Sequence, residues 1–159
     1  MRNLSLLITL VVPLSLFAQK ERKVIREGMR SFEEGDYGNA EVQFRKAADL
    51  NQESFEAAYN TGAALYEQNK YDESLKQYEQ LAGDEANQSY LPQLYYNMGN
   101  SLLEKQDYAQ SIEAYKKALR LNPDDDDARY NLAYARKKLQ EQQQQQQQRQ
   151  DQEEQQENQ

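Results

Sequence analysis

The sequence contains neither cysteine nor histidine. These absences exclude disulfide bonds and thiol chemistry, and they remove the commonest general base together with the usual ligands of zinc. Tryptophan is also missing, and 159 residues include only six glycines and three prolines, too few for a loop-rich β protein. The sequence therefore favours a helical protein without a catalytic centre built on histidine or cysteine.

Basic residues are fewer than acidic ones. The chain has 19 lysines and arginines against 27 aspartates and glutamates, which gives a net charge of -8. Because an acidic protein repels phosphate backbones, we expect no nucleic acid partner. The sequence has no phosphate-binding glycine loop and no serine in a nucleophile-elbow pattern. We therefore expect no enzyme, no cofactor, no metal site and no small-molecule substrate.

The first 18 residues have the composition of an export signal. Arg2 supplies a positive charge, residues 4–17 form an apolar run, and Ala18 precedes a polar stretch. The run is shorter than the roughly 20 apolar residues that span a bilayer comfortably. We expect residues 1–18 to be a cleaved signal peptide and the protein to be periplasmic. Because Leu16 is not a small residue, an uncleaved signal anchor in the inner membrane is the alternative.

Small and aromatic residues recur with a period of about 34 residues. A glycine is followed 12 positions later by a small residue and 16 positions later by an aromatic one. The second unit is shifted by 34 residues and the third by a further 37, with the extra residues in the polar connection 83–90. Small residues let two helices cross closely, and the aromatic residue fills the space beside the crossing. The three sets are Gly28, Ala40 and Phe44; Gly62, Ser74 and Tyr78; and Gly99, Ser111 and Tyr115.

Each unit is predicted to be a helix, a tight turn and a second helix. The turns read Gly-Asp-Tyr at 35–37, Asn-Lys-Tyr at 69–71 and Gln-Asp-Tyr at 106–108. Gly35 and Asn69 can take the left-handed conformation that ends a helix. Asp36 and Asp107 can cap the next helix by accepting hydrogen bonds from its backbone N–H groups.

This pattern resembles the tetratricopeptide repeat over about residues 21–125. The best match begins at Tyr95 and reads YYNMGNSLLEKQDYAQSIEAYKKALRLNP. The resemblance implies an all-α fold, a short solenoid of three helix-turn-helix repeats at residues 21–54, 55–88 and 92–125.

A fourth unit begins at Asp126 and is not completed. The sequence Tyr-Asn-Leu-Ala at 130–133 repeats the Tyr-Asn-Met-Gly at 96–99, but no second helix with the required apolar residues follows. We expect residues 126–140 to form a C-terminal capping helix that covers the last repeat. The aspartates at 124–127 lie at its N-terminus, where carboxylates favour the helix dipole, and they lack the glycine and the distal glutamate of a calcium loop.

Glutamine dominates the C-terminal end, with 13 glutamines among the last 20 residues. Such a segment has little apolar area to bury against the entropy cost of ordering. We expect residues 141–159 to form a disordered, solubilising tail.

In tetratricopeptide proteins the first helix of each repeat lines a concave groove. Asparagine offers a donor and an acceptor that match an extended peptide backbone, and tyrosine adds apolar area with a polar tip. The alternative is that the Tyr-Asn pairs serve packing between hairpins. By this resemblance, the groove is expected to be lined by Arg26, Tyr59, Asn60, Tyr66, Tyr96, Asn97, Asn100, Tyr130, Asn131 and Tyr134.

The order of segments along the chain points to one group of tetratricopeptide proteins. An export signal, three repeats, an Asn-Pro-Asp run, a basic helix end and polyglutamine are similar to the tetratricopeptide proteins of the Bacteroides aerotolerance (Bat) operon, of the BatC type. This resemblance implies a periplasmic protein-binding scaffold that works beside membrane-anchored von Willebrand A-domain proteins in an envelope stress role. A chaperone-like holdase and an envelope-assembly subunit are the alternatives.

Overall fold

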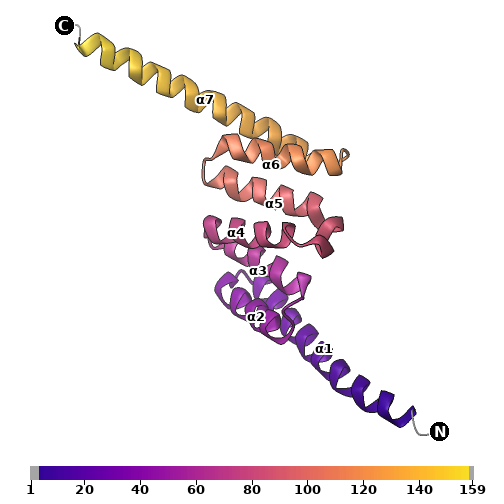
Figure 1. Cartoon of the computed structure of the whole chain (residues 1–159). Coiled ribbons are helices and arrows are strands. Elements are labelled where there is room, and N and C mark those ends of the chain that lie inside the picture. Colours follow the sequence, from indigo (N-terminus) through magenta and orange to yellow (C-terminus); the bar gives the residue numbers. More distant parts are fainter. Residues whose placement is uncertain (1–3, 158–159) are drawn as a thin grey trace. The chain divides into compact units, whose positions relative to one another are not determined.

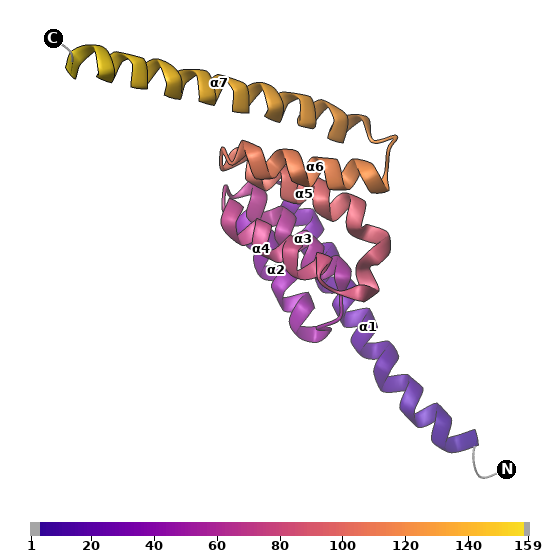
Figure 2. The same cartoon turned by 45° about the horizontal axis from the view of Figure 1, so that its top comes forward.

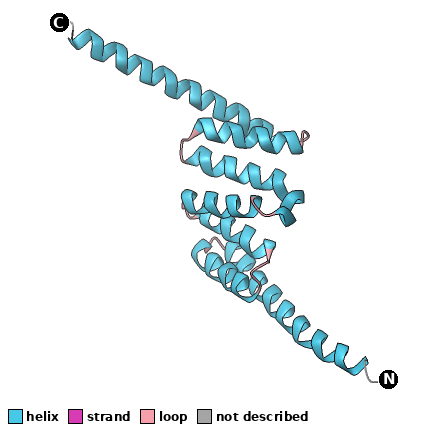
Figure 3. Cartoon of the chain, viewed as in Figure 1, coloured by secondary structure: helices cyan, strands magenta, loops and turns pink. Residues whose placement is uncertain are grey.

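The computed structural model describes the backbone of residues 4–157 and the side chains of residues 19–153 and 156. Within this part the chain is helical, with no strand (Figure 3), so the predicted all-α class is confirmed. The elements shown in Figure 1 are α1 (Leu4–Glu33), α2 (Tyr37–Leu50), α3 (Phe55–Glu67), α4 (Tyr71–Ala82), η1 (Glu85–Tyr90), α5 (Leu91–Glu104), α6 (Tyr108–Leu121) and α7 (Asp126–Glu157).

The helices form two compact units. Unit 1 comprises Met1–Asn87, in which α2 packs against α1 and α3, and α3 packs against α4. Unit 2 comprises Gln88–Gln159, in which α6 lies between α5 and α7 (Figure 2). The first two predicted repeats therefore fall in unit 1, and the third repeat falls in unit 2 with the helix after it.

The three hairpin turns share one backbone geometry. Gly35 and Asn69 have φ angles of 78° and 60°, which confirms the predicted left-handed conformation, and Gln106 adopts it as well with φ 62°. Two backbone hydrogen bonds close each turn, as in the third, where the N–H groups of Gln106 and Asp107 donate to Leu103 and Leu102. The same bonds recur in all three turns although their sequences differ.

Side-chain caps begin two of the three second helices. Asp36 accepts a hydrogen bond from the backbone N–H of Asn39 at 3.1 Å, and Asp107 accepts one from Gln110 at 3.2 Å. Both predicted caps are confirmed. Lys70 stands at the corresponding place in the second hairpin, where no side-chain cap forms.

The helices of each hairpin cross at a glycine. A Cβ atom on Gly28 would lie 2.6 Å from Cε1 of Phe44, and the corresponding distances are 2.8 Å from Gly62 to Tyr78 and 2.5 Å from Gly99 to Tyr115. All are shorter than real Cβ contacts, so the aromatic ring occupies the space where any larger residue would place its side chain. The predicted close crossing is confirmed in all three hairpins.

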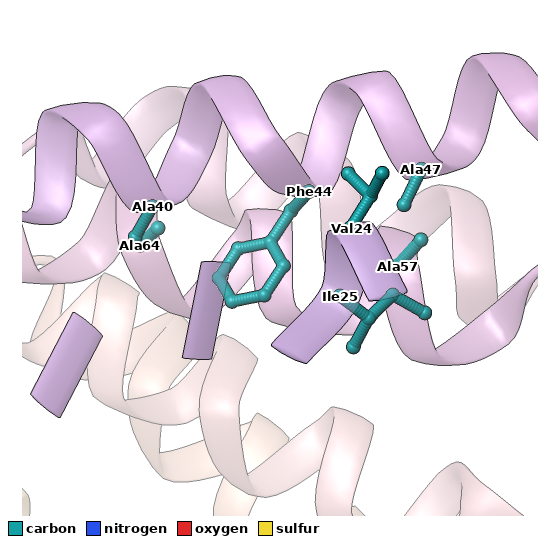
Figure 4. Packing of buried hydrophobic residues seen from close by; sticks show 7 residues of the cluster. All are labelled: Val24, Ile25, Ala40, Phe44, Ala47, Ala57 and Ala64. Carbon is teal, nitrogen blue, oxygen red and sulfur yellow. The ribbon is translucent and has the colours of Figure 1, made fainter. Parts of the chain in front are cut away.

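The apolar core of unit 1 continues from this contact. Phe44 is fully buried, and its neighbours come from all three of the helices α1, α2 and α3 (Figure 4). Most of them are small, so the helix backbones approach closely around a single large ring. The cluster comprises Val24, Ile25, Ala40, Phe44, Ala47, Ala57 and Ala64.

A carboxylate joins the first two hairpins. Glu41 on α2 accepts hydrogen bonds from Arg45 at 2.8 Å, from Gln68 at 2.9 Å and from Lys70 at 3.0 Å. Burial alone would raise the pKa of Glu41, but these three donors lower the pKa from 4.5 to about 2. The carboxylate therefore stays ionised in neutral and mildly acidic solution and ties α2 to the turn between α3 and α4.

The N-terminal helix is longer than the first repeat requires. We placed the start of that repeat at residue 21, whereas α1 begins at Leu4 and continues without interruption to Glu33. The side chains of residues 1–18 lie outside the described residues, so the signal peptide stays a prediction. Among the described residues, no helix combines the length and apolar character needed to cross a membrane.

The end of the chain differs from our expectation. We predicted a helix that ends at residue 140 and a disordered segment over 141–159, but α7 runs to Glu157. Glutamine is a good helix former, and the side chain of Asp125 caps the start of α7 through the N–H of Ala128 at 2.8 Å. Glu141 pairs with Lys138 at 3.1 Å, so helical contacts continue past the predicted boundary.

The first part of α7 covers α6. Its buried and partly buried apolar residues recur at spacings of four, three and four, which places them on one helix face. Leu132 and Ala135 form one apolar cluster with Ile112 and Tyr115 of α6, and Leu139 packs against that cluster. This face comprises Ala128, Leu132, Ala135 and Leu139.

We predict that Gly28→Ala destabilises unit 1 by about 1–3 kcal/mol, because the new methyl group overlaps the ring of Phe44 in a packed core. Gly38→Ala is the matched control, since the nearest atom to its Cβ is 4.0 Å away and alanine favours a helix. Thermal unfolding followed by circular dichroism measures both. Equal midpoints for the two variants would contradict the role given to the glycine contact.

Candidate functional site

Four polar side chains from three helices meet in unit 2. Asn100 on α5 accepts two hydrogen bonds at its Oδ1 atom, one from the hydroxyl of Tyr115 on α6 at 2.7 Å and one from Nδ2 of Asn131 on α7 at 3.1 Å. The same Nδ2 donates to the hydroxyl of Tyr96 on α5 at 3.3 Å. We call these residues, Tyr96, Asn100, Tyr115 and Asn131, the amide–phenol cluster.

Helix geometry explains how the cluster forms. Tyr96 and Asn100 are four residues apart on α5 and therefore lie on one face of that helix. Tyr115 reaches them from α6 because its ring lies against Gly99, and the rings of Tyr96 and Tyr115 are 6.0 Å apart. Asn131 approaches from α7, which is held on α6 by its apolar face. The cluster thus depends on the same packing that builds the unit.

The cluster has unused hydrogen-bonding capacity. Among the described residues, no partner is found for Nδ2 of Asn100 or for Oδ1 of Asn131. Both residues are only partly buried. A donor and an acceptor thus stand on two side chains that are hydrogen-bonded to each other. A peptide group, which has one N–H and one C=O, matches that pair.

Three of these four residues, Tyr96, Asn100 and Asn131, are among those predicted to line the groove, and the structure brings them together. Tyr115 was predicted to serve packing only, but it is both buried and hydrogen-bonded to Asn100. The signal in the sequence that could have identified this second role was the hydroxyl group of Tyr115, because the first hairpin has Phe44, without a hydroxyl, at the same place in the repeat.

The other predicted residues of unit 2 lie on α5 and α7 outside the cluster. Asn97 is partly buried next to Tyr96, and its carbonyl accepts a hydrogen bond from Ser101 at 3.1 Å. Tyr130 is 71% exposed on α7. Tyr134 is also exposed and has the ammonium group of Lys138 5.5 Å from its ring centre. Their part in binding stays a prediction.

The predicted tyrosines of unit 1 make contacts with other aromatic rings. Tyr59 stacks on Phe55 at 5.5 Å and meets Tyr78 edge-on at 5.6 Å, and Tyr66 meets Tyr71 at 5.4 Å. These are the contacts that the packing alternative expects.

The last two predicted residues of unit 1 differ from each other. Asn60 is partly buried and Arg26 is exposed.

In unit 1 the position equivalent to Asn100 is Ala63, which offers no side-chain acceptor to the hydroxyl of Tyr78. Burial raises the pKa of that hydroxyl well above its ordinary value.

Metal ligands are not gathered in the described part of the chain. No group of three or more aspartate or glutamate side chains there is placed to hold a metal ion. The aspartates at 124–127 instead serve the start of α7, where Arg129 binds Asp126 and the carbonyl of Pro123.

We predict that Tyr115→Phe destabilises unit 2 by about 1 kcal/mol, because it removes the hydrogen bond to Asn100. Tyr78→Phe is the matched control, since the Tyr78 hydroxyl has no hydrogen-bond partner among the described residues. Urea unfolding should show a lower midpoint for Tyr115→Phe alone. A similar loss in both variants would mean that the hydroxyl of Tyr115 has no special role.

Two family models match the sequence. Residues 25–90 match a model described as tetratricopeptide repeat, and residues 99–140 match one described as TPR repeat. The second match extends beyond the third hairpin into α7. No curated protein matches the sequence closely enough to count as a relative.

Solved structures share the fold at low identity. The first tetratricopeptide domain of Spaghetti (RPAP3), bound to the HSP90 peptide SRMEEVD, is 19% identical with a TM-score of 0.68, over 76% of this chain and 94% of that chain. The type III secretion chaperone SycD of Yersinia enterocolitica, in complex with a peptide of the translocator YopD, is 16% identical with a TM-score of 0.66, over 76% and 95%. A MamA fragment from Desulfovibrio magneticus is 25% identical with a TM-score of 0.65, over 72% and 63%.

Proposed function

We propose that this chain, a tetratricopeptide repeat protein, is a non-enzymatic scaffold that binds an extended segment of a partner protein. The observation that carries the proposal is the amide–phenol cluster, in which Asn100 and Asn131 hold each other in place and still offer one donor and one acceptor. Because their hydrogen bonds orient both amides before a ligand arrives, little side-chain entropy remains to be lost on binding.

Two of the similar structures support this class of function. The Spaghetti domain is bound to a peptide of HSP90, and SycD is in complex with a peptide of YopD. Both are proteins with the same fold and low identity to this chain. We infer a short extended segment as the ligand here because a peptide backbone is the chemistry that paired amides recognise.

We further propose that the scaffold works in the periplasm, as an adaptor of a Bat-type complex beside membrane-anchored von Willebrand A-domain proteins. The support is the apolar run at residues 4–17 after Arg2, together with the layout of repeats, basic helix end and glutamine-rich segment.

Intact-mass measurement of the protein from an envelope fraction tests the export step. We expect a chain that begins near Gln19, because Ala18 is the small residue at the end of the signal. A mass that includes residues 1–18 would contradict cleavage and support a signal anchor.

Pull-down from an envelope extract, followed by calorimetry against the partner it captures, tests the binding site. We expect Asn100→Ala and Asn131→Ala each to weaken binding about five- to tenfold, the loss of roughly one hydrogen bond. Glu113→Ala is the control, since that side chain is exposed on α6 and pairs with Lys116 on the same helix.

The same experiment separates the alternatives. One or two stoichiometric membrane partners would support the adaptor, whereas a broad set of unfolded clients would favour a holdase. Normal binding by both asparagine variants, with loss of binding on deletion of residues 141–159, would assign recognition to the distal part of α7 and refute the cluster.

A further inference from the structure

The first described turns of α1 are cationic, although the protein as a whole is acidic. Residues 20–30 carry five lysines and arginines against two glutamates, a net charge of +3 in a chain whose total is -8. All five cationic side chains are exposed on α1. They are Lys20, Arg22, Lys23, Arg26 and Arg30, which we call the α1 basic stripe.

Helix geometry makes most of these charges a single surface. Arg22, Lys23, Arg26 and Arg30 follow one another at spacings that keep them on one side of an α-helix, and Lys20 flanks them. The opposite side of α1 carries Val24, which is buried in the core of unit 1. Packing therefore holds the stripe toward solvent. Together with Gln19, its first four members line one shallow hollow.

The acidic side chains nearby neutralise little of the stripe. Glu27 and Glu34 lie 3.9 Å and 4.0 Å from Lys23 and Arg30, and Glu21 accepts a hydrogen bond from Asn51. Among the described residues, Arg22 and Arg26 have no ion-pair partner. Like charges three or four positions apart, such as these two, destabilise a helix. Their presence therefore needs a reason other than folding.

We propose that the α1 basic stripe binds anionic phospholipid headgroups at a membrane surface. In a chain that begins near Gln19, the stripe occupies the exposed face of the first turns of α1. Exposed cations clustered on one helix face are attracted to an anionic bilayer surface.

Charge also sets the orientation of the bound protein. Outside the stripe the chain has more acidic than basic residues, so the chain as a whole gains little attraction to an anionic bilayer from its remaining charges. Unit 1 would therefore face the membrane through α1. This proposal is independent of the peptide site in unit 2, because it uses different residues and a different kind of partner.

Vesicle co-sedimentation of the chain from Gln19 onward, the form expected after export, tests the proposal. One set of vesicles contains phosphatidylcholine alone and the other contains about 30% phosphatidylglycerol, a share that gives the surface an anionic potential. Binding that does not depend on charge is common to both sets, so the ratio of the two partition constants isolates the electrostatic part. We expect a ratio well above one at low salt that falls toward one as salt screens the stripe.

The double variant Arg22→Gln/Arg26→Gln should lower that ratio about 25-fold, because each cation near an anionic surface strengthens binding about fivefold. The matched control is Arg136→Gln/Lys137→Gln, which removes the same charge from exposed positions on α7. Circular dichroism confirms the fold of both variants.

Two results would overturn the proposal. They are a ratio near one for the unaltered protein and an equal fall in the control variant. If a ratio near one is accompanied by tight binding of polyglutamate in solution, the stripe binds an acidic protein partner instead.

Discussion

In every hairpin of this protein, a glycine on the first helix lies against an aromatic ring on the second. The ring fills the volume that a larger residue at Gly28, Gly62 or Gly99 would occupy. Because the backbones approach closely, small residues are enough to fill the space around Phe44. The same approach in unit 2 places the hydroxyl of Tyr115 within reach of Asn100. The candidate site thus depends on the contact that builds the fold.

The hairpins differ in what the aromatic residue does beyond packing. Phe44 has no hydroxyl. The hydroxyl of Tyr78 has no side-chain acceptor at the position of Ala63, where unit 2 has Asn100. Only in unit 2, within the described part of the chain, does the ring carry a hydrogen bond to an amide that is also bonded to the next helix. One difference between repeats, Ala63 against Asn100, therefore separates a position that only packs from one that also hydrogen-bonds to the next helix.

Charge is distributed unevenly along the molecule. Glu41 is surrounded by three donors and links two hairpins of unit 1, whereas Arg22 and Arg26 on α1 have no ion-pair partner among the described residues. The first arrangement serves folding, because the carboxylate is neutralised by its neighbours. The second leaves positive potential at the surface of an acidic protein, where it attracts anions.

The sequence by itself determined the helices, the turns and the contacts that repeat. The 34-residue period, the left-handed Gly35 and Asn69, and the capping Asp36 and Asp107 all follow from local chemistry, since a turn or a cap involves residues close in the chain. The glycine and aromatic positions follow from the recurrence of one pattern. These parts needed no knowledge of distant neighbours.

Tertiary structure decided the rest. Gln106 takes a left-handed conformation that its side chain does not favour, because the hairpin closes there. The glutamine-rich segment continues α7, since a capped helix already precedes it. The cluster joins Asn100 and Asn131, 31 residues apart. A hydrogen bond between such residues forms only when packed helices bring them within about 3 Å, and no local pattern encodes that distance.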